Sequence, residues 1–330
     1  MNSEYKNITN NIEEFFRNFF IKKQIAVAIS GGCDSMALTL ALNDFCKENK
    51  IKIYALTIDH GVRKNSKNEA KKVGELLKKF NISHKILTIP KKQIPQKNIE
   101  ANLREIRYEI LTNFCKKNDI EYLFAGHHLG DIAENFLIRL FRGSGLDGLS
   151  PIQKISEING VKIIRPFLEI SKDELKNYLI EKNIEWFEDE TNDDEKFLRN
   201  KIRKFLASFD DKNLLEKRIY NASLEISKTR DFFDEIMKGH ELEIIEQNAD
   251  GLTIINRHKL NEINHAIALK ILAKILMKIG DKKYKPRKEK LIRFYEYLIA
   301  EGAIKKREFY GCVVEKYRDE KVKIYNKVYL

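Results

Sequence analysis

The chain has 330 residues, enough for two domains with a sizeable core, and it carries 61 Lys and Arg against 49 Asp and Glu, a net charge of +12. This surplus indicates a polyanionic partner such as a nucleic acid, with codon bias toward lysine as the simpler alternative.

The four cysteines form neither a C-x-x-C pair nor a metal-ligand spacing, so we expect reduced thiols in a cytoplasmic protein. Arg17, Lys22 and Lys23 interrupt the N-terminal phenylalanines, which favours a short amphipathic helix over a signal peptide or membrane span.

The first predicted strand covers residues 25–29, a continuous apolar run typical of a strand buried on both faces of a parallel sheet. Gly31 and Gly32 follow, and because glycine has no Cβ, this backbone can take positive φ and approach a ligand closely. A helical pattern starts at Met36, so the N–H groups of the turn and of the helix N-terminus would face an anion. The missing Gly-Lys-Ser/Thr excludes a Walker A loop, and a plain strand–turn–helix is the alternative. The polar side chains of the turn that suit phosphate or metal chemistry are Ser30, Asp34 and Ser35.

Further strand-like runs at residues 51–58, 84–89 and 121–125 alternate with helical patterns. This alternation predicts βαβ units and a Rossmann-like α/β fold with a parallel sheet. In such a sheet the ligand lies beyond the carboxyl ends of the strands, so three separate motifs are predicted to meet there. The residues after the second and fourth strands that we expect to line the site are Asp59, His60, His127 and His128. Two helix starts carry capping boxes, Ser66 with Glu69 and Ser171 with Glu174.

A helix that starts near Asp131 would place Asp131 and Glu134 on one face, at i and i+3. Two carboxylates there could hold Mg²⁺ or the ammonium of an amine substrate, or remove the proton of the amine. Asp131 could equally be an N-cap beside the positive end of the helix dipole, and both roles can hold at once. The segment 143–148 matches G-x-G-x-x-G, but it follows an amphipathic helix and precedes Pro151. We therefore predict a flexible loop over the site rather than a dinucleotide site.

Basic side chains gather in three segments. Glu100, Arg104 and Arg107 lie at helical spacing, which is typical either of an ion-paired helix face or of a phosphate clamp. A basic run contains Arg199 and Arg203, and another covers residues 282–290. Either run could be a solvated face, but together with the net charge they predict a track for an RNA backbone. The lysines of the second run assigned to this track are Lys282, Lys283 and Lys285.

The pattern changes past about residue 208. Residues 211–248 predict one or two long polar helices, and residues 265–280 predict another. The chain end alternates apolar and polar residues around a turn at residues 318–320, which predicts a β-hairpin. We therefore expect an α/β domain over residues 1–208 and a mainly helical region over residues 209–330 that ends in the hairpin.

These segments, in this order, resemble the tRNA(Ile)-lysidine synthetases of the ATP pyrophosphatase, or PP-loop, superfamily. Most of the matching motifs lie within residues 20–208, and the rest of the chain matches only loosely. The segments that carry it are Ser30–Ser35, Asp59-His60-Gly61-Val62-Arg63, Asn98-x-Glu100-x3-Arg104-x2-Arg107-Tyr108, His127-His128-x2-Asp131-x2-Glu134, Arg142-Gly143-x-Gly145-Leu146-x-Gly148-Leu149, Arg165-Pro166-Phe167, Trp186-x2-Asp189-x-Thr191-Asn192 and Arg199-Asn200-x-Ile202-Arg203.

The resemblance implies a cytoplasmic enzyme that ligates lysine to the wobble cytidine of a tRNA(Ile) with a CAU anticodon. ATP adenylates the cytosine O2 and pyrophosphate leaves; the lysine ε-amine then attacks C2 and displaces AMP. By resemblance, residues 1–208 form the catalytic domain and residues 209–330 bind tRNA. Free L-lysine, ATP and Mg²⁺ are the implied small partners, no membrane is implied, and the oligomeric state stays open, a homodimer included.

The resemblance also implies a role for each matched residue. The Ser30–Ser35 loop, Cys33 included, would cradle the pyrophosphate, and Asp34 would help position Mg²⁺ together with Asp131. Asp131 and Glu134 would hold and deprotonate the lysine amine, since a protonated amine cannot attack. The arginines that would neutralise phosphates of ATP or tRNA are Arg104, Arg107, Arg199 and Arg203.

The chain departs from the family pattern at a few positions. Cys33 replaces a frequent proline, and Gly130 replaces a frequent second aspartate beside Asp131. Two alternatives stay open. One is a PP-loop enzyme that thiolates tRNA, which the missing C-x-x-C disfavours; the other is a non-catalytic tRNA-binding protein, which the intact loop disfavours.

Overall fold

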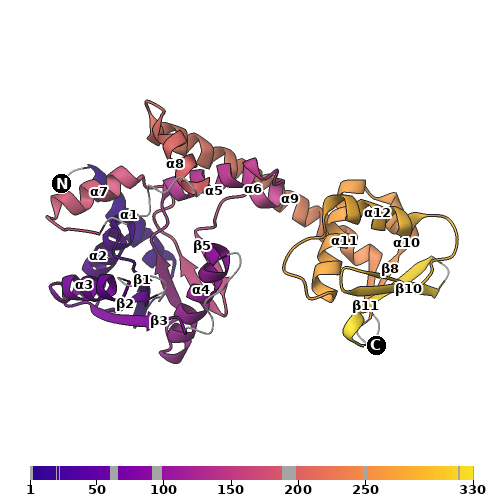
Figure 1. Cartoon of the computed structure of the whole chain (residues 1–330), viewed down its shortest axis with the longest axis horizontal. Coiled ribbons are helices and arrows are strands. Elements are labelled where there is room, and N and C mark those ends of the chain that lie inside the picture. Colours follow the sequence, from indigo (N-terminus) through magenta and orange to yellow (C-terminus); the bar gives the residue numbers. More distant parts are fainter. Residues whose placement is uncertain are drawn as a thin grey trace. The chain divides into compact units, whose positions relative to one another are not determined.

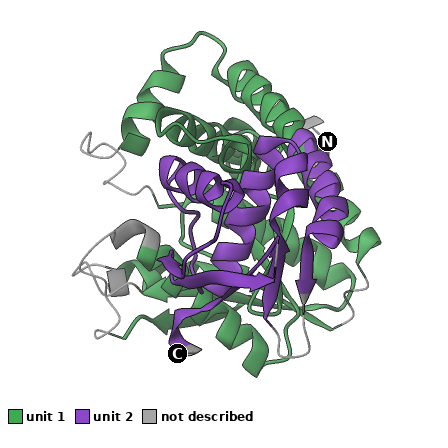
Figure 2. Cartoon of the chain, turned by 90° about the vertical axis from the view of Figure 1, so that its right-hand side faces the viewer, with its two compact units in different colours: residues 1–227 green, residues 228–330 purple. Residues whose placement is uncertain are grey.

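The computed structural model describes residues 3–19, 21, 23–59, 66–90, 99–187, 198–247, 252–318 and 320–329. The chain forms two compact units, residues 1–227 and residues 228–330 (Figure 2). Among the described residues, no helix combines the length and the apolar character needed to cross a membrane.

Unit 1 is built on a six-stranded sheet in the order β3-β2-β1-β4-β6-β5. The first four strands and β6 pair in parallel, as predicted from the βαβ pattern, and β5 is an antiparallel edge strand joined to β6 by a hairpin that the sequence did not reveal. The strands are β1 (Gln24–Ala28), β2 (Lys52–Asp59), β3 (Ser83–Thr88), β4 (Tyr122–Ala125), β5 (Ile155–Ile158) and β6 (Val161–Ile164).

Helices cover both faces of this sheet, as in other Rossmann-like folds (Figure 1). Successive side chains of a strand point to opposite faces, so Val27 of β1 packs in one core and Ala26 in another. The Val27 core includes residues of α1 (Ser3–Asn18), α2 (Cys33–Glu48), α3 (Ser66–Lys78) and α7 (Lys172–Glu181). The Ala26 core is closed by α4 (Ile99–Lys117). The α/β prediction is therefore confirmed.

A third group of helices extends this unit beyond the sheet. It consists of α5 (Leu129–Phe141), α6 (Leu146–Leu149), α8 (Leu198–Ala207) and the first part of α9 (Lys212–Ile244). Ala133 and Leu137 of α5 pack against Ile202 and Leu206 of α8 in a small separate core. This group matters for function because α5 begins at the carboxyl end of β4.

Unit 2 is an antiparallel sheet packed with helices, in the order β7-β8-β11-β10-β9. The expected terminal hairpin is confirmed as β10 and β11, but it lies inside a five-stranded sheet instead of closing a mainly helical region. The strands missed from the sequence are only three or four residues long, too short for alternation to be visible. The elements are β7 (Ile245–Gln247), β8 (Thr253–Asn256), α10 (Arg257–Glu262), α11 (His265–Ile279), α12 (Lys288–Ile299), β9 (Arg307–Phe309), β10 (Cys312–Arg318), β11 (Lys321–Asn326) and the 3-10 turn η3 (Lys327–Tyr329).

Two helix boundaries differ from the sequence expectation. Helix α2 begins at Cys33, three residues before the predicted Met36, so Asp34 and Ser35 lie in its first turn. Helix α9 is one continuous helix of 33 residues where one or two were predicted. The first expected capping box includes Ser66, and the side chain of this residue lies outside the described residues, so the box stays a prediction.

The second capping box is confirmed and predicts a stability effect. The Ser171 hydroxyl accepts a hydrogen bond from the Glu174 backbone N–H at 3.2 Å, and Glu174 Oε2 accepts from the Ser171 N–H at 2.8 Å. Because Ser171→Ala removes this acceptor at the start of α7, we expect it to lower the free energy of unfolding by about 1 kcal/mol in chemical denaturation. The matched control is Ser208→Ala at an exposed position, and equal effects from both variants would contradict the capping assignment.

Candidate active site at the carboxyl ends of the strands

The turn between β1 and α2 has a backbone that suits a bound phosphate. Gly31 has φ +90°, and a Cβ there would lie 2.6 Å from Val73 Cγ2 and 3.0 Å from the Phe187 ring. Only glycine fits this position without strain. The hydroxyl of Ser35 ties the turn together by accepting from the Ser30 N–H at 3.2 Å and donating to the Gly32 carbonyl at 3.0 Å. Gly32 is the N-cap of α2 and no side chain caps the helix, so its N-terminal N–H groups can face an anion.

The start of α5 brings two more predicted residues to the same place. His128 is the N-cap: its Nδ1 accepts from the Gly130 N–H at 3.0 Å, while Asp131 Oδ2 accepts from the His128 N–H at 3.2 Å. Asp131 is thus the third residue of a capping box and not the N-cap, because α5 begins at Leu129. Since Nδ1 accepts, the neutral His128 carries its proton on Nε2.

His128 lies between two carboxylates. Its Nε2 is 3.6 Å from Asp34 Oδ2 and 3.8 Å from Asp131 Oδ2. Burial would raise the pKa of Asp131, but the neighbouring His128, the hydrogen bond from its backbone N–H and the charge of Arg199 lower this pKa below its usual value. Asp131 is therefore an anion at neutral pH, beside the phosphate-binding turn.

Two carboxyl oxygens at this point fit Mg²⁺, which prefers oxygen ligands. Asp34 Oδ1 is buried and has no hydrogen-bond partner, so it has a free lone pair at the turn. Among the described residues, no group of three His, Cys, Asp or Glu side chains forms a complete metal site. A bound Mg²⁺ would therefore need further ligands from a substrate phosphate or from water.

Glu134 links α5 to α8 through two arginines. Its Oε1 accepts from Arg203 Nε at 2.6 Å, and its Oε2 lies 3.2 Å from Arg199 Nε. Glu134 is 6% exposed, so these charges compensate each other in a desolvated place. The basic run around residue 200 thus has two arginines at the active site, a placement that its composition did not indicate.

Arg104 and Arg107 of α4 also reach the site. Arg104 Nη2 is 3.4 Å from His127 Nε2, and both guanidiniums lie over the Tyr108 ring, 5.6 and 5.5 Å from its centre. Burial is the main cause that lowers the pKa of His127 to about 3, and Arg165, Arg104 and Arg107 lower it further. His127 is therefore neutral at physiological pH and can accept a hydrogen bond from Arg104.

A cleft of about 770 Å³ lies beside α4. Arg104, Tyr108 and the buried Arg165 contribute to its wall, together with Lys116. Its volume is in the range of ligand sites, and its cations suit a phosphate. Arg165 entered the sequence analysis only as part of the Arg-Pro-Phe motif, since no spacing relates it to Arg104.

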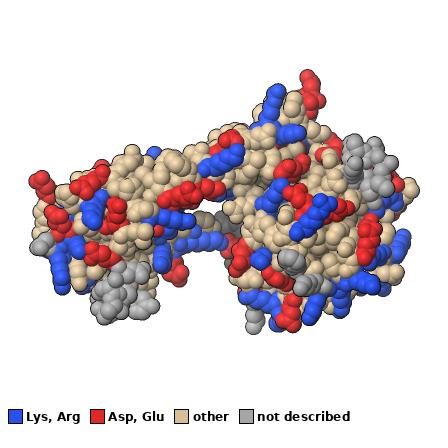
Figure 3. Space-filling view, turned by 180° about the vertical axis from the view of Figure 1, so that it is seen from behind, with Lys and Arg blue, Asp and Glu red and all other residues tan. Residues whose placement is uncertain are grey.

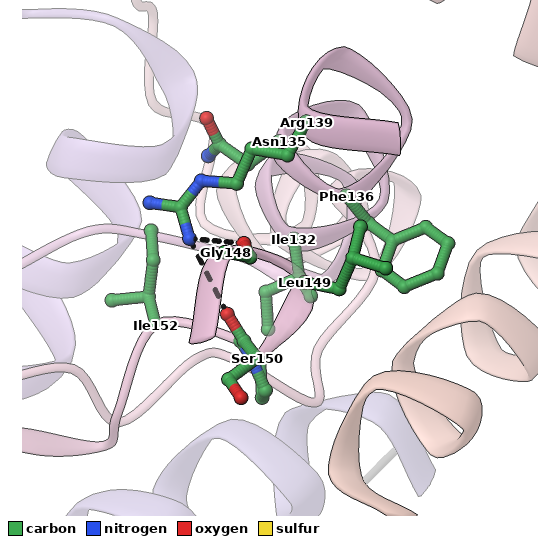
Figure 4. A pocket seen from close by; sticks show the side chains of 9 residues that line it. Ile132, Asn135, Phe136, Arg139, Gly148, Leu149, Ser150 and Ile152 are labelled. Atoms are coloured by element: carbon green, nitrogen blue, oxygen red, sulfur yellow. Dashed lines mark hydrogen bonds between the residues drawn. The ribbon is translucent and has the colours of Figure 1, made fainter. Parts of the chain in front are cut away.

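The end of the glycine-rich segment 143–148 is hydrogen-bonded to α5. It leads into the short helix α6, and Arg139 of α5 donates from Nη1 to the Gly148 carbonyl at 2.6 Å and to the Ser150 carbonyl at 3.5 Å (Figure 4). The cavity beside Arg139 holds about 10 Å³, room for at most one water. The segment follows helix α5 and not a strand, so it lacks the strand–turn–helix context of a dinucleotide site, and its flexibility stays a prediction.

Two other predicted residues of unit 1 lie at the same edge of the sheet. Asp59 is buried at the end of β2, and Cys33 is buried in the first turn of α2. His60 lies outside the described residues. The remaining candidates are in unit 2, in the exposed segment between α11 and α12, and are Lys282, Lys283 and Lys285.

Comparison with known proteins agrees with this geometry. The fold and its phosphate-binding turn define a PP-loop protein, and the family described as PP-loop domain matches residues 4–209. A tRNA(Ile)-lysidine synthase of Wolbachia pipientis wMel is 34% identical over 90% of this chain and 69% of its own length. That of Orientia tsutsugamushi (strain Boryong) is 35% identical over 92% of this chain and 69% of its own length. The chain therefore belongs to the tRNA(Ile)-lysidine synthase family.

A solved structure supports the fold alone. The U34-tRNA thiolase of Methanococcus maripaludis, solved with its 4Fe–4S cluster, has a TM-score of 0.57 and 17% identity, and the match covers 68% of this chain and 78% of the thiolase. At this identity the likeness extends to the arrangement of strands and helices and not to the chemistry.

The lowered pKa of His127 predicts an acid-sensitive contribution to stability. In the unfolded state His127 binds a proton near its usual pKa of 6.5, whereas in the folded state its pKa is about 3. The free energy of unfolding therefore falls as the pH drops from about 6.5 toward 3. We expect this contribution to change by at most about 1.4 kcal/mol per pH unit, and His127→Gln to remove it. Chemical denaturation at pH 7, 6 and 5, with His258→Gln at an exposed position as control, measures the difference; parallel curves for wild type and His127→Gln would contradict the assignment.

Proposed function

We propose that the protein ligates lysine to C2 of the wobble cytidine of a tRNA(Ile) with a CAU anticodon, in two steps. ATP first adenylates the cytosine O2 and releases pyrophosphate. The lysine ε-amine then attacks C2, and AMP leaves with the O2 oxygen, which gives lysidine. The observation that carries the proposal is the meeting of the phosphate-binding turn with Asp34, His128 and Asp131 in a chain of this family.

The turn is assigned to the phosphates of ATP. Gly31 and Gly32 let the backbone approach the β and γ phosphates, and the Ser30 and Ser35 hydroxyls can donate to their oxygens. Asp34 and Asp131 would hold Mg²⁺, which would neutralise the departing pyrophosphate. Arg104 and Arg107, with Arg165 in the cleft beside them, suit the remaining phosphate charge.

The acidic pair on α5 is assigned to the lysine amine. A carboxylate whose pKa is lowered, such as Asp131, binds an ammonium well. Glu134 is one helical turn further and keeps a fixed orientation through Arg199 and Arg203, so an incoming amine would share Glu134 with these two guanidiniums. The amine must lose a proton before it attacks, and these carboxylates are the nearest acceptors on α5.

Unit 2 is assigned to the tRNA backbone. It carries 23 Lys and Arg against 16 Asp and Glu, a net charge of +7, in 103 residues. Basic and acidic side chains are interspersed over the face seen in Figure 3. In the sequence of this unit the basic residues gather most densely in the run of residues 282–290. A dimer stays a proposal that neither the sequence nor the fold decides.

The thiolation alternative is disfavoured by the state of the cysteines. All four are free and buried, and burial raises the pKa of Cys46 and Cys115 to about 12. A sulfur-transfer reaction needs a thiolate, and a buried thiol with a raised pKa is inert. A binding protein without catalysis is disfavoured by the intact phosphate-binding turn, since binding tRNA alone does not need such a turn.

The substrate prediction tests the function directly. Purified protein with Mg²⁺, ATP, radiolabelled lysine and an unmodified tRNA(Ile) bearing CAU should incorporate label and release AMP and pyrophosphate. The methionine tRNA shares the CAU anticodon and should be a poor substrate; a preference of about 100-fold corresponds to about 2.8 kcal/mol in the transition state.

The matched variant for this assay is Asp34→Asn, which keeps the shape of the side chain and removes its charge. We expect it to abolish incorporation with an unchanged circular dichroism spectrum. Incorporation of sulfur or ammonia in place of lysine would keep the PP-loop chemistry and reject the lysidine assignment.

The basic run predicts a salt dependence of tRNA binding. Each neutralised phosphate contributes about −0.7 to −0.9 to the slope of log K against log salt concentration. Replacing Lys282, Lys283 and Lys285 by alanine should lower the magnitude of this slope by about two to three. The control replaces the same number of exposed lysines on α3, Lys71, Lys72 and Lys78, and should leave the slope unchanged. Equal slopes for wild type and the unit 2 variant would show that this run is only a solvated face.

A further inference from the structure

Helix α9 places a buried carboxylate beside the active site that the proposed reaction does not use. Glu216 is 2% exposed and lies beyond residues 4–209, the part of the chain that the PP-loop family matches. Its helix neighbours Leu215 and Ile219 pack against the small core of α5 and α8. A charged side chain in this apolar contact between helices requires a physical explanation.

The carboxylate of Glu216 is poorly compensated. Its Oε1 lies 3.6 Å from Lys212 Nζ, beyond hydrogen-bond distance, and its Oε2 is buried with no hydrogen-bond partner. Burial raises the pKa of Glu216, while the charges of Lys212 and His128 oppose this shift. Replacing a buried charge by an apolar side chain of similar volume is often neutral or stabilising in proteins, so the carboxylate points to a role besides stability.

A missing side chain lets Glu216 reach the start of α5. A Cβ on Gly130 would lie 3.1 Å from Glu216 Oε1 and 2.8 Å from His128 Cε1. Helix α5 therefore has a gap at this position, with the carboxylate on one side and the imidazole on the other. The backbone N–H of the same glycine donates to His128 Nδ1 at 3.0 Å, so this end of the imidazole is held by α5 itself.

We propose that Glu216 is a positioning residue of the active site, which acts through His128 across the gap at Gly130. Its carboxylate confines the imidazole to the orientation in which Nε2–H faces Asp34 and Asp131. Helix α9 thereby completes the catalytic unit, although it is also the helix that continues into unit 2. What the site does with this orientation rests on the proposed function.

A purely structural role is the competing explanation, because a carboxylate near a helix N-terminus interacts favourably with the helix dipole. The two roles predict opposite effects on stability. If Glu216 only stabilised α5, removing its charge would lower the melting temperature. If it positions His128 at a cost in desolvation, removing the charge should leave the melting temperature equal or higher and reduce turnover.

The test variant is Glu216→Gln, which keeps the shape and removes the charge. We expect kcat for lysidine formation to fall about tenfold or more, with the KM values for ATP, lysine and tRNA within about twofold of wild type. The control is Glu235→Gln, at an exposed position of the same helix, and it should match wild type. A wild-type kcat in Glu216→Gln, or a loss of kcat that accompanies a lower melting temperature, would overturn the proposal.

Gly130→Ala supplies an independent variant. Helix propensity alone predicts that alanine stabilises α5 by up to about 1 kcal/mol, whereas the gap predicts a displaced His128 and a lower kcat. Because both changes act on one contact, the double variant Gly130→Ala/Glu216→Gln should be little worse than either single variant. Additive losses would overturn the shared mechanism.

A spectroscopic measurement separates this proposal from the proposed function. The imidazole ¹⁵N shifts of His128 should report protonation on Nε2 in the wild type and a mixed or altered population in Glu216→Gln, whatever reaction the protein catalyses. Unchanged shifts would overturn the positioning role. Failure of the wild type to incorporate lysine, with the expected shifts present, would reject the function and leave the positioning role standing.

Discussion

The capping interaction at the start of α5 is the contact on which the rest of the site depends. The His128 side chain accepts from the Gly130 N–H, and the Asp131 side chain accepts from the His128 N–H, while the same His128 ring lies 3.6 Å from Asp34. Local backbone geometry and active-site geometry are therefore set by the same hydrogen bonds. A change that disturbs one of them must disturb the other.

Desolvation explains the distribution of charge around this contact. Glu134 is buried next to two arginines, whereas His127 lies among arginines and stays neutral. The two arginines compensate the charge of the Glu134 carboxylate. The His127 ring stays neutral because a further positive charge beside the arginines would be unfavourable. The result is a site with anions at the start of α5 and cations on α4 and α8, suited to an ammonium and to phosphates at once.

Helix α9 relates this site to the rest of the chain. Its first part packs with α5 and α8, and its last part belongs to unit 2, where the net charge is concentrated. A carboxylate on this helix that contributes to the site would make the catalytic unit longer than the family match of residues 4–209. Glu216 lies past residue 209, where that match ends.

The sequence alone determined the parallel-sheet fold, the phosphate-binding turn and the pairing of Asp131 with Glu134, because each depends on residues close together in the chain. Periodicity over five or more residues and glycine at a fixed offset need no distant partner to be recognised. The tertiary structure decided that Arg199 and Arg203 face Glu134, that Arg165 lines the cleft with Arg104, and that Glu216 reaches the gap at Gly130. It also decided the three short strands that surround the terminal hairpin. These features depend on packing between segments far apart in the chain, and no local pattern carries that information because the burial that gives each charge its role exists only in the folded protein.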